Sequence, residues 1–225
     1  MNFEGFSPEI LLRYNFTYNF LVGAATITKL ARDIEAKGQT ATETERLQHK
    51  AFVSGCIMQS VAALESDVWS LLFHGPGHHL GSDGLDKHSK DILNIVADTF
   101  EKGLSIMTKL DLILQLTKRK KLDTGIQPMQ DLDLVISLRN ELTHFKSLWT
   151  NELDRKKFFK TLESKDSIPP TYSPEGRQNF FPHICLTHRR AKWALDTVIC
   201  FIDYYYNELE IKSPLDGYER KDITV

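Results

Sequence analysis

The chain has 225 residues, of which 41% are hydrophobic and 26% are charged, a composition that excludes an intrinsically disordered protein. Its formal net charge of −2 excludes a surface coated with basic residues, so any contact with nucleic acid must be local. The cysteines, Cys56, Cys185 and Cys200, are widely spaced, which indicates reduced thiols and neither a disulfide framework nor a zinc site. No window approaches the ~18 apolar residues of a membrane span, so we expect a cytoplasmic protein without a membrane partner.

The first part of the chain carries the signals of two long helices. Pro8 after Ser7 favours a helix start, and this helix is expected to end before Gly38. The run Thr42-Glu43-Thr44-Glu45 is a capping box, in which the first hydroxyl and the last carboxylate each accept a hydrogen bond from the other residue's backbone N–H. It predicts a second helix that continues to about Phe73.

Residues 74–88 hold four histidines and two aspartates, side chains that can bind a metal ion: His74, His78, His79, Asp83, Asp86 and His88. The segment is rich in glycine and lacks a helical pair of histidines four residues apart, so nothing fixes the geometry of a metal ion. We interpret it as a flexible loop or a rim facing a substrate, with a metal site as the alternative. We expect no metal and no cofactor.

A third helix is predicted from apolar residues that recur at helical spacing between Ile92 and Leu116. The densest positive charge of the chain follows it, at Lys118, Arg119, Lys120 and Lys121. Cations at a helix C-terminus complement the macrodipole, so a solvated helix end is one interpretation. The other is that the run contacts the phosphates of RNA.

Residues 131–149 combine a helical apolar stripe with three polar groups. The stripe residues fall three or four apart: Leu132, Val135, Leu138, Leu142, Phe145 and Trp149. Asn140 and His144 are four residues apart and share a face beside the stripe, and the long side chain of Arg139 can reach the same spot. A surface ion pair or a capped side chain is one interpretation, and convergence of the three groups on one anion is the other.

These three side chains have a definite chemistry if they converge. A neutral imidazole accepts a proton from a hydroxyl near neutral pH, a guanidinium binds a phosphate bidentately, and an amide orients either group. Together they suffice to cleave RNA without a metal, with the substrate's own 2′-hydroxyl as the nucleophile.

The C-terminal third is predicted to contain a loop, a helix and a tail. Prolines and a glycine in 164–182 indicate a long loop. The last helix is expected over about 183–211. Its first turns carry three cations, which oppose the macrodipole and indicate an anion nearby: His188, Arg189 and Arg190. Residues 213–225 are expected to form a flexible tail with little to bury.

The segment Leu138 to Phe145 resembles the signature helix of the HEPN superfamily, which has an arginine, a polar residue directly after it, and a histidine four to six residues beyond the arginine. The segment Cys56 to Trp69 looks like the earlier long helix of many HEPN proteins, where small residues and a glutamate pack against the signature helix. The resemblance implies an all-helical protein whose dimer brings two signature helices to one cleft.

The resemblance also implies roles for individual residues. His144 is expected to be the general base or acid, Arg139 to hold the scissile phosphate and stabilise its developing charge, and Asn140 to orient one of them. Glu65, in the earlier helix, is expected either to position Arg139 or to form a structural ion pair with it.

We therefore expect one domain over residues 1–225, an all-α up-and-down bundle of about four or five main helices in which the second helix packs against the signature helix. The first functional hypothesis is a metal-independent endoribonuclease of HEPN type, a toxin or an antiphage defence effector. It acts on RNA as a homodimer, and an antitoxin or regulatory protein restrains it. The second is a non-catalytic helical module that binds a partner through the dimer surface or the aromatic N-terminal face, with Arg139 and His144 as a buried polar anchor.

Overall fold

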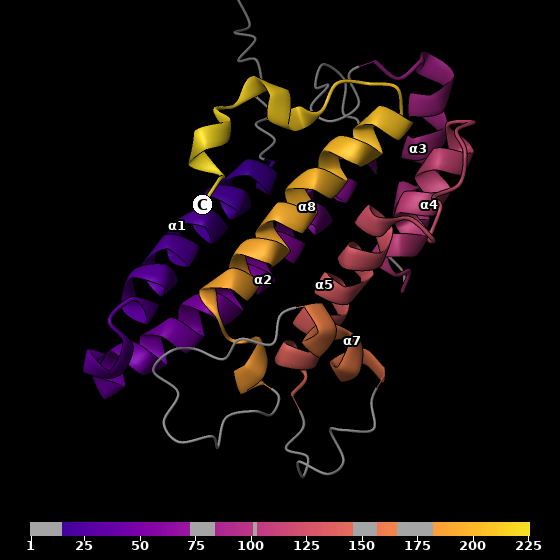
Figure 1. Ribbon diagram of the computed structural model, residues 1–225. Coiled ribbons are helices and arrows are strands. Elements are labelled where there is room, and N and C mark those ends of the chain that lie inside the picture. Colours follow the sequence, from indigo (N-terminus) through magenta and orange to yellow (C-terminus); the bar gives the residue numbers. More distant parts are fainter. Residues whose placement is uncertain (1–14, 73–83, 101–102, 146–156, 166–181) are drawn as a thin grey trace, which may run out of the picture.

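The computed structural model describes residues 15–72, 84–100, 103–145, 157–165 and 182–225 (Figure 1). Within these ranges the chain forms seven α-helices and no β-strand, so the predicted all-α class is confirmed. The α-helices are α1 Thr17–Glu35, α2 Glu43–Leu72, α3 Lys87–Phe100, α4 Ile106–Leu116, α5 Gln127–Thr143, α7 Lys157–Lys165 and α8 His188–Glu208. Four short 3-10 helices accompany them: η1 Gly38–Thr40, η2 His183–Cys185, η3 Pro214–Gly217 and η4 Arg220–Asp222.

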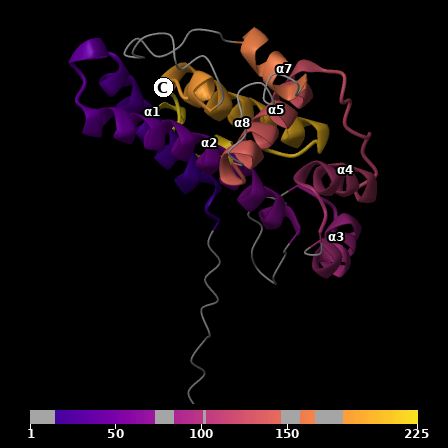
Figure 2. The same cartoon turned by 90° about the horizontal axis from the view of Figure 1, so that it is seen from below.

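Three long helices, α1, α2 and α8, form the centre of the bundle. α1 and α2 are joined through η1 and pack along each other, and α8 packs against both (Figure 1). α5 contacts α2 and α8, and α7 contacts α5, while α3 and α4 pair with each other beside the end of α2 (Figure 2). The expected contact between the second helix and the helix that carries Arg139 is confirmed.

The turn between α1 and α2 follows from the local sequence. Gly38 has a φ of +56°, a left-handed conformation that glycine adopts without strain. The backbone N–H of Glu45 donates to Oγ1 of Thr42 at 3.2 Å, and the backbone N–H of Thr42 donates to Oε2 of Glu45 at 2.8 Å. The predicted capping box is therefore confirmed, and it places the start of α2 at Glu43.

The core contains a polar connection between α8 and two other helices. Tyr205 and Tyr206 of α8 are buried, and the Tyr205 hydroxyl donates to the main-chain oxygen of Leu110 in α4 at 2.8 Å. The Tyr206 hydroxyl donates to Oδ1 of Asp67 in α2 at 3.1 Å. Burial raises the pKa of Asp67 to about 7, although the hydrogen bond from Tyr206 acts in the opposite direction. Asp67 is therefore a buried carboxyl group whose protonation changes near neutral pH.

The third predicted helix is in fact two helices, α3 and α4. Gly103 lies between them with a φ of +72°, and Ser105 then caps α4 by accepting a hydrogen bond from the Thr108 N–H at 3.1 Å. Apolar residues continue at helical spacing across this break, which is why the sequence predicted a single helix. The predicted number of four or five main helices is too low for the described residues.

The C-terminal segment 213–225 is packed against the bundle. Leu215 and Ile223 are buried, and both Nη atoms of Arg220 donate to Asp203 of α8 at 2.8 Å. The prediction of a tail with little to bury is wrong. Single apolar residues between polar ones have no periodicity that predicts their burial.

Two predicted loops fall largely outside the described residues. Of the histidine-rich segment 74–88, the structure describes the part from Gly84 onward, in which His88 is exposed on α3. Of the segment 164–182, it describes the last two residues of α7 and Pro182.

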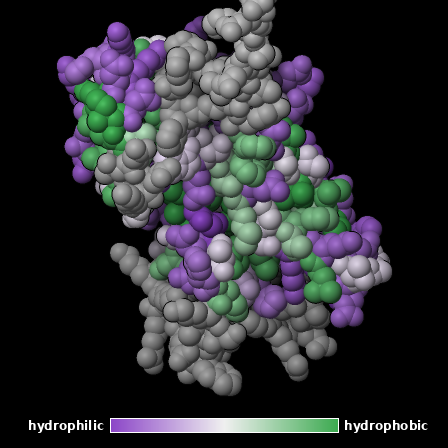
Figure 3. Space-filling model, turned by 180° about the vertical axis from the view of Figure 1, so that it is seen from behind, coloured by the Kyte–Doolittle hydropathy of each residue, from purple (hydrophilic) through white to green (hydrophobic). Residues whose placement is uncertain are grey.

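Hydrophobic side chains gather on two parts of the surface when the molecule is seen from behind (Figure 3). One lies over α1 and the start of α2, where Leu30 is 44% exposed and Leu47 is 63% exposed. The other lies over α3, where Ile95 is 78% exposed. None of the helices in the described ranges combines the length and the apolar character needed to cross a membrane.

Candidate functional site

The candidate site is built on α5, which packs through Leu132, Val135 and Leu138, all fully buried. Arg139 follows Leu138 and lies at the edge of the contact with α2. Its Nη2 donates to Oε1 of Glu65 on α2 at 2.5 Å. The Arg139 side chain is 23% exposed and that of Glu65 is 41% exposed, so the ion pair lies at the border between core and solvent. The expected contact between the two residues is present.

Arg139 keeps hydrogen-bonding capacity beyond this pair. A guanidinium has five N–H donors in a rigid planar arrangement. The Nε of Arg139 is buried and has no hydrogen-bond partner among the described residues. Because this Nε is closed to solvent, a ligand can contact Arg139 only through the exposed part of its side chain.

His144 lies at the C-terminal end of α5 rather than inside the helix. Its φ and ψ are −108° and 34°, and its backbone N–H donates to the main-chain oxygen of Asn140 at 2.9 Å. The helix was predicted to continue to Trp149, but α5 ends at Thr143, and residues 146–149 are outside the described ranges. His144 and Asn140 are both exposed, so each can meet a ligand from solvent.

The structure does not bring Arg139 and His144 together within one chain. Five residues along a helix correspond to a rotation of about 140° around its axis, so the two side chains leave α5 in different directions. Arg139 points to Glu65, and in the described part of the chain no hydrogen bond or ion pair joins Arg139 to His144. Asn140 and His144 are four residues apart and are linked by a backbone hydrogen bond, and the convergence of their side chains stays a prediction.

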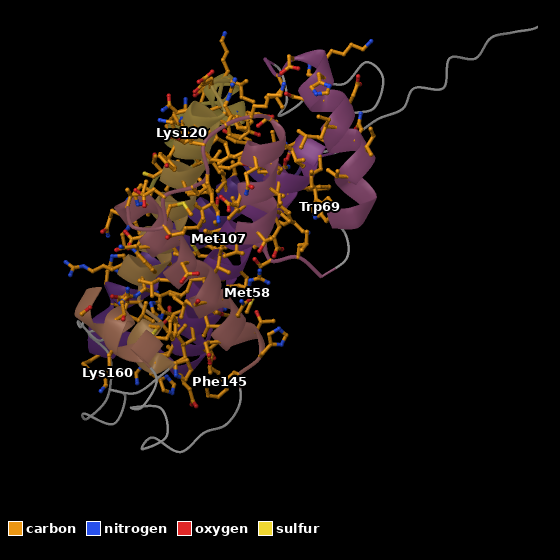
Figure 4. The ribbon with its side chains drawn as sticks, turned by 90° about the vertical axis from the view of Figure 1, so that its right-hand side faces the viewer. Met58, Trp69, Met107, Lys120, Phe145 and Lys160 are labelled. Carbon is orange, nitrogen blue, oxygen red and sulfur yellow. The ribbon has the colours of Figure 1, made fainter. Side chains whose placement is uncertain are left out.

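Large apolar side chains are exposed near this end of α5. Met58 of α2 is 39% exposed and Phe145, directly after His144, is 45% exposed. Phe145 was predicted to belong to the buried stripe, but the helix ends before it. Figure 4 shows Met58 on α2 above Phe145, with Met107 and Trp69 further up the same side of the molecule. The polar motif is therefore accompanied by an apolar surface.

Half of the basic run after α4 is engaged in structural contacts. Nε of Arg119 donates to the main-chain oxygen of Leu209 at 3.2 Å, and its Nη2 lies 3.0 Å from Oε2 of Glu210. Nζ of Lys121 lies 3.1 Å from Oδ2 of Asp111. Lys118, which has a φ of 59°, is exposed. Lys120 is also exposed (Figure 4). Arg119 and Lys121 therefore connect the loop to the end of α8 and to α4.

The cations at the start of α8 meet an anion that belongs to the chain itself. Oε2 of Glu35, at the end of α1, accepts from the His188 backbone N–H at 2.9 Å, and its Oε1 lies 3.1 Å from Nδ1 of His188. Arg190 is buried, and its Nη2 donates to the main-chain oxygen of Leu162 at 3.0 Å. Of the three predicted cations, Arg189 alone is exposed.

Sequence reasoning missed Glu35 and its second partner, His49. Nε2 of the fully buried His49 lies 2.8 Å from Oε2 of Glu35. Burial acts to raise the pKa of Glu35, but the hydrogen bonds with His49 and with the His188 backbone outweigh it and lower the pKa below its usual range. The cations at the start of α8 predicted an anion, but no local pattern shows that it comes from α1.

Comparison with protein-family models, with curated proteins and with solved structures gives no match to this chain.

Proposed function

We propose that the chain is a metal-independent endoribonuclease of HEPN type, with Arg139, Asn140 and His144 as its active-site residues. The observation that supports it best is the state of Arg139. Its guanidinium is paired with Glu65 at the border between core and solvent, where the exposed part of the Arg139 side chain can bind an anion. Asn140, on the last turn of the same helix, and His144, directly after its end, are both exposed, so a flexible RNA strand can reach them.

In this proposal His144 accepts the proton of a ribose 2′-hydroxyl. The 2′-oxygen then attacks the adjacent phosphorus and forms a P–O2′ bond, while the P–O5′ bond breaks. The 5′-oxygen leaves with a proton from a protonated imidazole or from water. Arg139 binds the phosphate and stabilises the charge that develops on it, and Asn140 orients the reacting groups. The products are a 2′,3′-cyclic phosphate and a 5′-hydroxyl.

The proposal includes a homodimer. Because Arg139 and His144 leave α5 in different directions, a site with both groups on one phosphate is more easily completed by a second copy across a two-fold axis. The exposed Met58 and Phe145 supply apolar surface for that contact. The proposed role is a toxin or an antiphage defence effector in the cytoplasm, which must be kept inactive until it is needed. An antitoxin or regulatory protein that covers this end of α5 would restrain the activity.

The direct test is cleavage of a single-stranded RNA by the full chain in the presence of EDTA. We expect products with a 2′,3′-cyclic phosphate, no cleavage of DNA, and loss of activity in Arg139→Ala and His144→Ala. His88→Ala is a matched control, because His88 is an exposed histidine on α3, outside the motif. A reaction that stops with EDTA and returns with zinc or manganese would overturn the proposal.

The ion pair between Arg139 and Glu65 and the exposed apolar side chains also fit a second function. The ion pair has the geometry and partial burial of a purely structural one. Met58 and Phe145 form an apolar surface suited to a protein partner. In that case the chain is a non-catalytic dimerisation or partner-binding module. RNA cleavage and self-association separate the two: the ribonuclease cleaves RNA and loses cleavage in Arg139→Ala, whereas a binding module cleaves no RNA in the wild type and the variant changes only its association or stability.

A further inference from the structure

Lys109 of α4 is a cation whose position is set by an aromatic ring. Its Nζ lies 4.1 Å from the centre of the Trp69 ring on α2, within the range of a cation–π contact. Among the described residues, no carboxylate forms an ion pair with Lys109. The residue is partly exposed. The indole therefore holds the ammonium group in place without neutralising it, and an anion from solvent can reach it.

This contact lies on the same face of α2 as the ion pair between Glu65 and Arg139. Glu65 and Trp69 are four residues apart on α2, so their side chains leave the helix in nearly the same direction. Four residues correspond to about 6 Å along the helix axis. α2 contacts both α4 and α5, and Figure 4 shows Trp69 on the same side of the molecule as Met58. Two consecutive turns of α2 therefore hold Arg139 from α5 and Lys109 from α4.

The charges on this face leave a positive surplus. The residues of α2 that share it are Met58, Ala62, Glu65 and Trp69, so Glu65 is the charged one among them. Glu65 is already paired with Arg139. On α4, Asp111 is turned toward the following loop, where its Oδ2 lies 3.1 Å from Nζ of Lys121. The charge of Lys109 is therefore not balanced by a carboxylate of α2 or α4.

Two cations held in line on one helix suit an anion that repeats along a chain. A single strand of RNA carries one phosphate for each nucleotide, and proteins bind such strands through cations that follow the backbone. If the scissile phosphate lies at Arg139, the strand must continue past the residues beside Arg139. Lys109 is a cation that it meets along α2.

We propose that Lys109, held by Trp69, binds a backbone phosphate of the RNA close to the scissile one, so that the strand runs along α2 between the end of α5 and the start of α4. The inference rests on the proposed ribonuclease function and adds a substrate-positioning residue to it. Lys109 touches the substrate at a distance from the reacting atoms and takes no part in proton transfer.

The test is binding of a fluorescent single-stranded oligoribonucleotide, measured by anisotropy at several salt concentrations. The full chain carries His144→Ala throughout, so that the RNA stays intact. In this background Lys109→Gln should weaken binding several-fold and lower the slope of log K against log salt by about 0.7, which corresponds to the loss of one phosphate contact. Lys109→Arg keeps a cation that can lie over the indole and should bind as the parent does.

Lys29→Gln is the matched control, because Lys29 is a partly exposed lysine on α1. It removes the same charge and should leave the affinity and the salt slope unchanged. In the chain with His144 intact, Lys109→Gln should raise KM for RNA cleavage and leave kcat and the product ends unchanged, because it removes binding that is equal in the ground state and the transition state. A purely structural role of the contact with Trp69 would change the melting temperature and not the salt slope.

The outcomes separate this inference from the ribonuclease proposal. Cleavage by the wild type, with the same affinity and salt slope in Lys109→Gln as in its parent, would overturn the role of Lys109 and leave the ribonuclease standing. No cleavage by the wild type, with weaker RNA binding in Lys109→Gln, would overturn the ribonuclease and support the phosphate contact. Equal weakening by Lys29→Gln would reduce the effect to total charge and overturn the role of Lys109. No binding of RNA by the parent would overturn both.

Discussion

The guanidinium of Arg139 on α5 is joined to the carboxylate of Glu65 on α2 across the contact between the two helices. The pair restricts the guanidinium to one side of α5, and its Nε remains unpaired among the described residues. In the proposed ribonuclease, Glu65 therefore acts through Arg139 as a positioning residue and does not touch the substrate.

Replacing Glu65 with alanine should lower kcat for RNA cleavage by roughly 10- to 100-fold, because a misplaced guanidinium stabilises the transition state poorly. The melting temperature should change little, since partly exposed ion pairs contribute at most about 1 kcal/mol. Glu65→Gln keeps an oxygen that can accept from Arg139 and should retain most of the activity. Kinetics and thermal unfolding of both variants provide the measurement.

Glu210→Ala is the matched control for Glu65→Ala, because it breaks another partly exposed arginine–glutamate pair, with Arg119. It should leave cleavage unchanged. A loss of activity equal to that of Glu65→Ala would show that Glu65 has no specific role in positioning Arg139.

The basic residues after α4 should differ in function, with Lys118 and Lys120 contributing to RNA binding and Arg119 to the stability of the fold. Lys118 and Lys120 are exposed, so replacing both with glutamine should weaken RNA binding and reduce the slope of log K against log salt by about one to two, as phosphate contacts do. Arg119→Gln removes the contacts with Leu209 and Glu210 and should instead lower the stability of the fold. Binding titrations at several salt concentrations, together with thermal unfolding, distinguish the two. Equal salt slopes for the wild type and the double lysine variant would remove Lys118 and Lys120 from the RNA surface.

The buried carboxyl of Asp67 should make stability fall as the pH rises. Its pKa is about 7 in the folded chain, against an ordinary value of 3.8, so between these two values the folded state binds a proton that the unfolded state lacks. The extra proton on Asp67 contributes up to about 4 kcal/mol to the free energy of unfolding. This contribution is fully present below pH 3.8, the ordinary pKa, and is lost as the pH rises through about 7. Asp67→Asn keeps an oxygen acceptor for the Tyr206 hydroxyl and removes the charge.

Urea unfolding of Asp67→Asn should therefore show a smaller decrease in stability between about pH 5 and pH 8 than the wild type shows. Asp133→Asn, an exposed aspartate on α5, should behave as the wild type does. Parallel pH profiles for the wild type and Asp67→Asn would mean that the Asp67 carboxyl does not titrate in this interval.

Local signals in the sequence predicted those parts of the fold that depend on neighbouring residues. The capping box at Thr42 and Glu45 positioned α2, and the spacing of Leu132, Val135 and Leu138 identified the buried face of α5. The same spacing rule failed at Gly103, because a single glycine can break a helix without interrupting the apolar pattern.

Local sequence patterns did not predict the contacts between segments that are far apart in the sequence. Glu65 was expected to meet Arg139 because the resemblance placed the two helices together. Glu35 was not expected to meet His188, since the two are 153 positions apart and no pattern connects them. The direction in which His144 points also depends on where α5 ends, and the stripe that was predicted to reach Trp149 gave no sign of that end.

The packing of the C-terminal segment yields the last prediction. Ile223 is fully buried although it follows a short 3-10 helix near the end of the chain, so Ile223→Ala should create a cavity and lower the free energy of unfolding by about 2–4 kcal/mol. Thr224→Ala, at the exposed neighbouring position, should change it by less than about 0.5 kcal/mol. Urea unfolding of the two variants measures the difference. If both match the wild type, the segment contributes nothing to stability and behaves as the flexible tail that its composition suggests; a loss confined to Ile223→Ala shows that the segment is part of the folded core.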